Sequence, residues 1–380
     1  MPQLDPVPDR DLDRVLEEST AATPVPGVQA ALLRRGRLVW SGTYGAARDG
    51  TPVDARTVFC LASLGKTLVA ALALRLVEQG RLHLDRPIAD IVPEVPGADV
   101  VTPRMLLGHT AGYPEIYVTP ALAPLFPRDA AEEPEEAGDG AGAAYDPDRP
   151  FTWAMLLPGF ADPVRPGTHW EYSNGGYILL TELLVRLHGG PDGLAAGWRE
   201  LAARAGAPAD DLVLDRAQVD LARMARGHTD DGGEIVDAYA AHPPRGIPTD
   251  LFGLPFGDGL FAGTATAVAT FLDGLFVQQT VLEPATLDLM TTTTAQAAAA
   301  AHEVPDPVLA TYGLGTLRIE AEGGSWQGHR GSYGGFLVLG ASERTRGLSL
   351  TVLTNLACAD PPALAIWRAL AAEALRVAQG

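Results

Sequence analysis

Ser63 and Lys66 lie three residues apart, where an apolar run gives way to a long helical pattern. At this spacing, two side chains on a helix share a face with about 5–6 Å between their Cβ atoms, so the amine can reach the hydroxyl. A serine hydroxyl becomes an effective nucleophile when a neighbouring base removes its proton. Lysine is such a base only in its neutral form, which burial or nearby positive charge favours. Alternatively, the serine caps a helix and the lysine faces solvent.

A second candidate motif, Tyr172-Ser173-Asn174, precedes a predicted helix over residues 176–187. A phenol can shuttle a proton when a nearby cation stabilises its ionised form. The Asn174 amide can orient a lysine or a substrate carbonyl. The alternative interpretation is a simple turn, because Tyr-Ser-Asn-Gly-Gly has typical turn composition.

The third candidate segment begins at His329 and leads into an apolar run over residues 333–339, which predicts a strand. Gly331 would let a ligand backbone approach the edge of that strand. The backbone N–H of Ser332 could then form an oxyanion hole with the N–H of Ser63.

Two side chains of this segment could set the charge around a substrate: His329 and Arg330. Arg330 could bind a substrate carboxylate through two hydrogen bonds, or it could be a solvated charge at a strand end. His329 could equally be a polar residue at a strand end.

The order of these motifs, Ser-x-x-Lys, then Tyr-x-Asn, then His-x-Gly, resembles the class C β-lactamase family. That family includes D-alanyl-D-alanine carboxypeptidases, D-aminopeptidases, esterases and some acyltransferases. The resemblance runs from about residue 27 to 375 and includes further segments at residues 82–88, 102–112, 166–170, 257–264, 312–315 and 352–355.

The resemblance implies an α+β, β-lactamase-like fold in which an antiparallel sheet is flanked by helices and joined by a helical domain. It places residues 1–65 and 265–380 in the sheet domain and residues 66–264 in the mainly helical domain, with the active site in the cleft between them. It implies catalytic roles for Ser63, Lys66 and Tyr172. Substrate-binding roles are expected for five further residues: Asn174, His329, Arg330, Gly331 and Ser332.

Hydrophobic periodicity and turn residues predict the elements around these motifs. A buried helix is expected over residues 64–79, with Gly80 as its C-terminal cap. The other expected elements are a helix at 9–20, a hairpin of 28–33 with 38–43, strands near 311–319, 333–340 and 347–354, and a closing helix at 361–377.

Composition excludes several classes of protein. The net charge of −19 makes nucleic acid and anionic membranes poor partners, and no apolar run is long enough to predict a membrane span. The two cysteines form no disulfide framework, and the histidines lack the spacing of a metal site, so no metal or cofactor is predicted. An acidic stretch at residues 128–150 is expected to be a solvated insertion or a lid.

The N-terminal residues lack the basic and apolar regions of a signal peptide, so we expect a cytoplasmic protein. The leading hypothesis is a biosynthetic acyl-serine enzyme that hydrolyses an ester or amide of a small metabolite or peptide, or transfers its acyl group to an amine or alcohol. The competing hypotheses are a D,D-carboxypeptidase, D-aminopeptidase or β-lactamase-type hydrolase, and an inactive binding protein on the same fold. The sequence does not choose the acyl donor, the acceptor or the oligomeric state.

Overall fold

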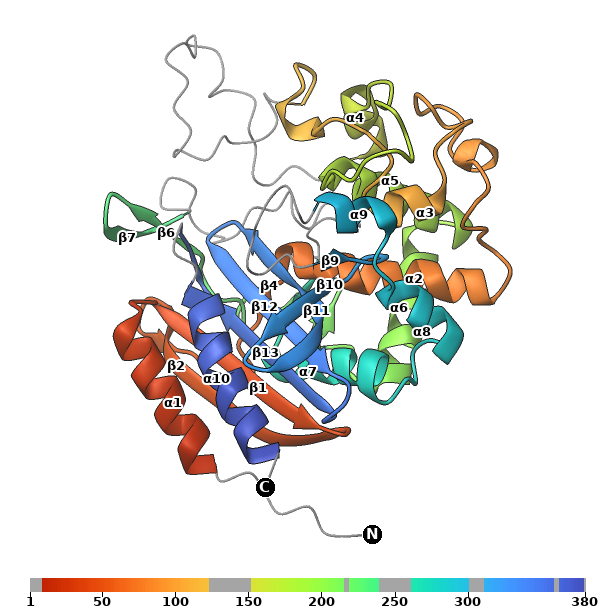
Figure 1. The fold of residues 1–380 in the computed structure, drawn as a ribbon. Helices are drawn as coiled ribbons and strands as arrows, with labels where there is room; N and C mark the ends of the chain where they lie inside the picture. Colours follow the sequence, from red (N-terminus) through yellow and green to blue (C-terminus); the bar gives the residue numbers. More distant parts are fainter. Residues whose placement is uncertain are drawn as a thin grey trace, which may run out of the picture.

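The computed structural model confirms the α+β fold class. An antiparallel sheet lies at its centre, and helices cover both faces of the sheet (Figure 1). The structure describes residues 9–122, 152–214, 219–238, 261–300, 311–358 and 362–378. The predicted acidic insertion at residues 128–150 lies outside the described residues.

In the described residues, the central sheet has eight strands in the order β3-β2-β1-β13-β12-β11-β10-β9, and all neighbouring pairs are antiparallel. Strands from the two ends of the chain meet where β1 pairs with β13, from Val28 opposite Thr354 to Arg34 opposite Leu348. The strands are β1 Gly27–Arg34, β2 Arg37–Arg48, β3 Thr51–Pro52, β9 Thr311–Tyr312, β10 Leu317–Ala321, β11 Gly324–Tyr333, β12 Phe336–Glu343 and β13 Leu348–Thr354.

Helices α1 (Asp9–Ala22) and α10 (Pro362–Ala378) lie side by side over one face of the sheet (Figure 1). Trp367 of α10 meets Trp326 of β11 edge to face, with 4.9 Å between the ring centroids. This packing confirms the helices predicted at both ends of the chain.

The opposite face of the sheet packs on α7, and further helices lie beyond it (Figure 1). The Thr264 side chain caps α7 by accepting a hydrogen bond from the Ala267 N–H. The remaining helices are α2 Gly65–Glu78, α3 Pro103–Leu107, α4 Trp153–Leu156, α5 Asn174–Leu187, α6 Pro191–Ala205, α7 Ala265–Leu272, α8 Pro284–Thr291 and α9 Ala295–Ala300.

Within the parts of the chain that the structure describes, two small sheets accompany the central one. In one of them, β8 pairs with both β4 and β5. This pairing fixes the position of β4, the strand that directly precedes the Ser63 turn. The strands of the small sheets are β4 Phe59–Cys60, β5 Leu212–Val213, β6 His228–Asp231, β7 Glu234–Asp237, β8 Ala262–Gly263 and β14 Leu356–Ala357. The division into domains at residues 65 and 264 stays a prediction.

The predicted strand over residues 333–340 begins too early, because β12 begins at Phe336. Gly334 and Gly335 have φ values of 60° and 80° and turn the chain between β11 and β12. Two consecutive glycines adopt this conformation without a Cβ penalty, so the apolar run is interrupted by a tight hairpin. Residues 329–332 consequently lie inside β11 rather than ahead of a strand.

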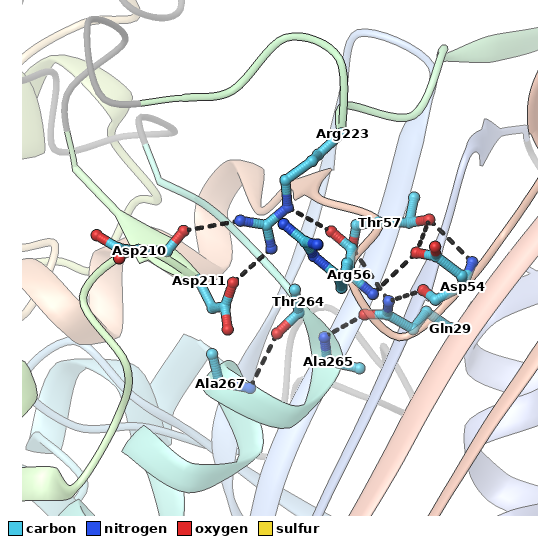
Figure 2. A network of polar contacts seen from close by, with 10 residues as sticks. All are labelled: Gln29, Asp54, Arg56, Thr57, Asp210, Asp211, Arg223, Thr264, Ala265 and Ala267. Carbon is cyan, nitrogen blue, oxygen red and sulfur yellow. Dashed lines mark hydrogen bonds and ion pairs between the residues drawn. The ribbon is translucent and has the colours of Figure 1, made fainter.

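A polar network fixes the approach to the nucleophile segment (Figure 2). The buried Gln29 side chain of β1 donates to the carbonyls of Asp54 and Thr57, at 2.6 and 3.0 Å, and accepts from the Ala265 N–H at the start of α7. Arg223 donates to the Arg56 carbonyl at 2.8 Å. One loop is thus held to the central sheet, to α7 and to a distant segment before the chain enters β4.

We predict that Gln29→Leu destabilises the fold by about 2–4 kcal/mol. The substitution leaves the Thr57 carbonyl and the Ala265 N–H without their present partner, whereas the Asp54 carbonyl still accepts from the Thr57 N–H. Each of the two buried unsatisfied groups costs about 1–3 kcal/mol. Chemical denaturation should measure the loss. Gln79→Leu, at an exposed position, is the control and should change stability by under about 0.5 kcal/mol. Equal effects of the two substitutions would contradict the importance of the network.

Candidate active site

Ser63 lies in a short 3-10 turn, Ala62–Leu64, between β4 and α2. Its side chain is partly exposed, whereas Ala62 and Leu64 are buried. Ala62 has a φ of +46°, a conformation that is uncommon for a residue with a Cβ and that occurs preferentially at functional sites. The Leu61 N–H donates to the Phe261 carbonyl at 2.8 Å and anchors the turn. The backbone therefore presents the serine at the surface of an otherwise buried segment.

The Lys66 side chain is completely buried in the first turn of α2. Its Nζ lies 3.0 Å from Ser63 Oγ and 2.9 Å from Asn174 Oδ1. Nζ also lies 4.9 Å from the centroid of the Tyr172 ring. The structure thus brings together residues of the first two predicted motifs, although Lys66 and Asn174 are 108 positions apart.

Asn174 begins α5, where Ser173 caps the helix by accepting from the Gly176 N–H at 3.0 Å. Asn174 Nδ2 donates to Glu115 Oε2 at 3.1 Å. Because the carboxylate can only accept from the amide, this contact turns Asn174 Oδ1 toward Lys66. Sequence reasoning missed Glu115, and no spacing or composition signal marks this single glutamate.

His109 stabilises the second motif through a buried hydrogen bond. Its Nδ1 accepts from the Ser173 N–H at 3.1 Å, which requires a neutral ring protonated on Nε2. Burial, and secondly the positive charge of Lys66, hold the pKa of His109 well below its ordinary value. The ring packs 4.3 Å from that of Tyr172, between centroids. His109 therefore acts as a structural hydrogen-bonding residue beneath the second motif.

His329 is expected from the sequence to help set the charge around a substrate, but the structure indicates that it carries no charge near neutral pH. Its substrate-binding role stays a prediction. The residue is buried, and this burial lowers its pKa to about 3. Its Nδ1 donates to the Arg330 carbonyl at 2.5 Å, and its Nε2 accepts from the Tyr312 hydroxyl at 3.1 Å. His329 therefore stays neutral under ordinary conditions and positions the strand. Sequence reasoning also missed Tyr312, which contacts the site through this hydrogen bond to His329.

Gly331 brings β11 into direct contact with the nucleophile turn. A Cβ at this position would lie 2.2 Å from the Leu61 carbonyl oxygen and 3.0 Å from the Leu64 nitrogen. The sequence predicts that the missing side chain makes room for a ligand backbone. In the structure, part of this room is occupied by the turn that presents Ser63.

Ser332 lies on a free stretch of the β11 edge. The described pairing of β10 with β11 ends at Gly328, whereas β12 pairs with β11 through to Tyr333. Tyr333 and Phe336 flank the two-residue turn as a hydrogen-bonded pair, and such pairs alternate along an antiparallel ladder. The N–H of Ser332, the adjacent residue, therefore points away from β12 and toward the free edge.

A cavity of about 480 Å³ lies at Ser63, which is one of its lining residues. Tyr172 and Trp170 form one wall, and the segment from His329 to Ser332 forms another. An apolar set of lining residues lies beyond this strand edge, comprising Leu317, Leu337, Val338, Leu339, Cys358 and Leu364.

Within the described parts of the chain, no three histidine, cysteine or acidic side chains are grouped as metal ligands would be. No helix in those parts is both long and apolar enough to cross a membrane.

Comparison with known proteins identifies the family of the chain. A family model described as Beta-lactamase matches residues 12–375. Esterase EstB of Burkholderia gladioli is 35% identical over 109 residues, which cover 27% of this chain and 28% of that protein. The human mitochondrial serine beta-lactamase-like protein LACTB is 32% identical over 111 residues, covering 27% of this chain and 20% of that protein. The aligned chain thus spans under a third of either relative.

Solved structures match over nearly the whole chain. The D-amino acid amidase of Ochrobactrum anthropi SV3, complexed with D-phenylalanine, superposes with a TM-score of 0.73 at 21% identity and covers 97% of this chain and 99% of that one. An octameric penicillin-binding protein homologue from Pyrococcus abyssi gives a TM-score of 0.72 at 22% identity, covering 97% of this chain and 77% of that one. At these identities the likeness concerns the fold.

We predict that His329→Gln makes stability less dependent on pH below about pH 6.5. The folded protein protonates His329 only near pH 3, whereas an unfolded chain does so near pH 6.5. Between these values the unfolded state binds more protons, so the free energy of unfolding falls as the pH falls, by up to about 1.4 kcal/mol per pH unit for one group. Buried His109 adds to this slope in the same direction.

Urea unfolding between about pH 7 and about pH 5 should therefore show a shallower slope for His329→Gln than for the wild type. Glutamine retains polar groups that can contact Tyr312 and the Arg330 carbonyl. His83→Gln, at an exposed position, is the matched control and should keep the wild-type slope. Parallel profiles for His329→Gln and the wild type would contradict a buried, neutral His329.

Proposed function

The chain belongs to the Beta-lactamase family, a family of serine hydrolases, and on this basis we propose that it is an acyl-serine enzyme. Its substrate would be an ester or amide of a small metabolite or peptide. The main support is the buried Lys66 amine, which lies 3.0 Å from the partly exposed Ser63 hydroxyl. A buried amine at hydrogen-bond distance from a serine is the arrangement that nucleophilic catalysis requires.

The proposed acylation step uses these contacts directly. Lys66 Nζ takes the proton of Ser63 Oγ while Oγ attacks the substrate carbonyl carbon. The N–H groups of Ser63 and Ser332 stabilise the oxygen that becomes negative. The proton then passes from Lys66 to the leaving group, with the Tyr172 hydroxyl as the relay. The bond to the leaving group breaks, and the acyl group remains on Ser63.

Deacylation repeats these roles with a second nucleophile. Lys66 and Tyr172 take a proton from water, or from an amine or alcohol acceptor, as it attacks the acyl-serine carbonyl. The bond between the acyl carbon and Ser63 Oγ then breaks, and Lys66 returns the proton to Oγ. Water gives hydrolysis, and the other acceptors give acyl transfer. Which one prevails depends on how well the cleft excludes water and holds an acceptor.

The relatives support both kinds of bond as substrates. One aligned relative is named an esterase, and one structural neighbour is named a D-amino acid amidase. The latter favours a D-amino acid amide or peptide as the second candidate. Arg330, which lines the cavity, would bind the terminal carboxylate of a peptide substrate.

An inactive binding protein on the same fold has weaker support. Such a protein would gain nothing from a buried lysine held between Ser63 and Asn174. A cytoplasmic location and a biosynthetic role stay predictions.

We predict that an activated ester or a fluorophosphonate modifies Ser63 covalently. Intact-mass analysis should show one adduct, and peptide mapping should place it on Ser63. Ser41, which is exposed on β2, supplies a control: Ser41→Ala should label like the wild type, whereas Ser63→Ala should not label. Unchanged labelling of Ser63→Ala would refute the proposal.

We further predict that Lys66→Ala and Tyr172→Phe each lower kcat by about 10²–10⁴. The double variant should lose much less than the product of the two losses, because the residues act on one proton. Tyr44→Phe, on an exposed tyrosine, is the control and should leave kcat unchanged. Independent, multiplicative losses would instead make Tyr172 a substrate-binding residue. Circular dichroism should verify that Lys66→Ala is folded.

A further inference from the structure

The cavity at Ser63 continues around the free edge of β11 to the other face of the strand. His329 and Gly331 face the nucleophile side, where Gly331 contacts the Leu61 carbonyl. Arg330 and Ser332 alternate with them and face the side covered by α10, because side chains along a strand point to opposite faces in turn. One cavity therefore has a catalytic part and a second part on the opposite face of the same strand.

Apart from Arg330 and Ser332, the walls of that second part are apolar. Leu339 lies opposite Arg330 across the ladder, and Leu337 lies opposite Ser332, so these leucines share the α10 face. Three further residues line this part of the cavity. We call the whole set the apolar arm: Leu317, Leu337, Leu339, Cys358 and Leu364.

We propose that the apolar arm binds an uncharged alkyl or aryl group of the substrate. This inference rests on the proposed function, since it assigns the arm to the molecule that acylates Ser63. The whole cavity, about 480 Å³, falls in the range of small-molecule sites. Transfer of an apolar group from water into this arm is favourable, whereas a charged group would lose its hydration. The apolar group can come from the acyl part of the substrate or from its leaving group.

Two series of esters distinguish these sources. In one, the acyl chain lengthens from acetyl to octanoyl on a constant p-nitrophenol. In the other, the alcohol chain lengthens from methyl to hexyl on a constant acyl group. In the series whose chain enters the arm, kcat/KM should rise about fourfold for each buried methylene, until the arm is full. Flat responses in both series would overturn the proposal.

Leu364 offers the sharpest variant, because it is only partly buried in the first turn of α10. Leu364→Asp should lower kcat/KM for the longest ester of the responding series by at least about tenfold, and for the shortest by less than about threefold. Ala365→Asp, exposed on the same helix turn, adds the same charge outside the arm and should resemble the wild type. An equal loss for short and long esters in Leu364→Asp would count against the arm.

Cys358 provides a test that does not need catalysis. It lines the arm outside any disulfide, whereas Cys60 is completely buried. In Ser63→Ala, hexyl methanethiosulfonate should modify Cys358 at least about tenfold faster than the methyl reagent, after correction for their rates with glutathione. Peptide mapping identifies the modified cysteine. Equal corrected rates would overturn the arm. Faster hexyl labelling of Ser63→Ala, together with a failure of esters to acylate Ser63 in the wild type, would support the arm and refute the proposed function.

Discussion

The candidate site depends on one buried amine. Lys66 is completely enclosed, and its Nζ is held between the hydroxyl of Ser63 and the amide oxygen of Asn174. A buried amine or ammonium is costly unless polar groups surround it, so these contacts must be fixed by the fold. Glu115 supplies part of that fixation by holding the Asn174 amide nitrogen. The positions of α2, α5 and the loop that carries Glu115 are thereby coupled through a single side chain.

The same constraint explains the backbone around the nucleophile. Ser63 must approach Lys66 while remaining accessible, and the turn achieves this with the positive φ of Ala62. The turn is then enclosed by β11, where Gly331 permits backbone contact, and by Phe261, whose carbonyl accepts from Leu61. Rigid support of this kind is what a positioned nucleophile requires, since catalysis falls steeply when reacting groups are misplaced.

Much of this arrangement could be predicted because its signals are local. The spacing of Ser63 and Lys66, the periodicity of α2 and the motif before α5 each lie within a short segment, and the order of the motifs carried the family resemblance. The neutral state of His329 could not be predicted, because it follows from burial against Tyr312. Glu115 was missed for a similar reason, since its role exists only after folding brings a distant amide within reach.

The alternation of β11 also separates two functions. Its residues facing the nucleophile side shape the turn at Ser63, while those facing α10 lie among leucines. Because the strand period is two, a substitution on one face leaves the other face largely unchanged. The backbone N–H of Ser332 lies at the edge between these faces and can serve the reacting carbonyl whatever occupies the leucine-lined side. This geometry would allow substrate preference to change through residues of α10 and β12 while the reacting groups keep their positions.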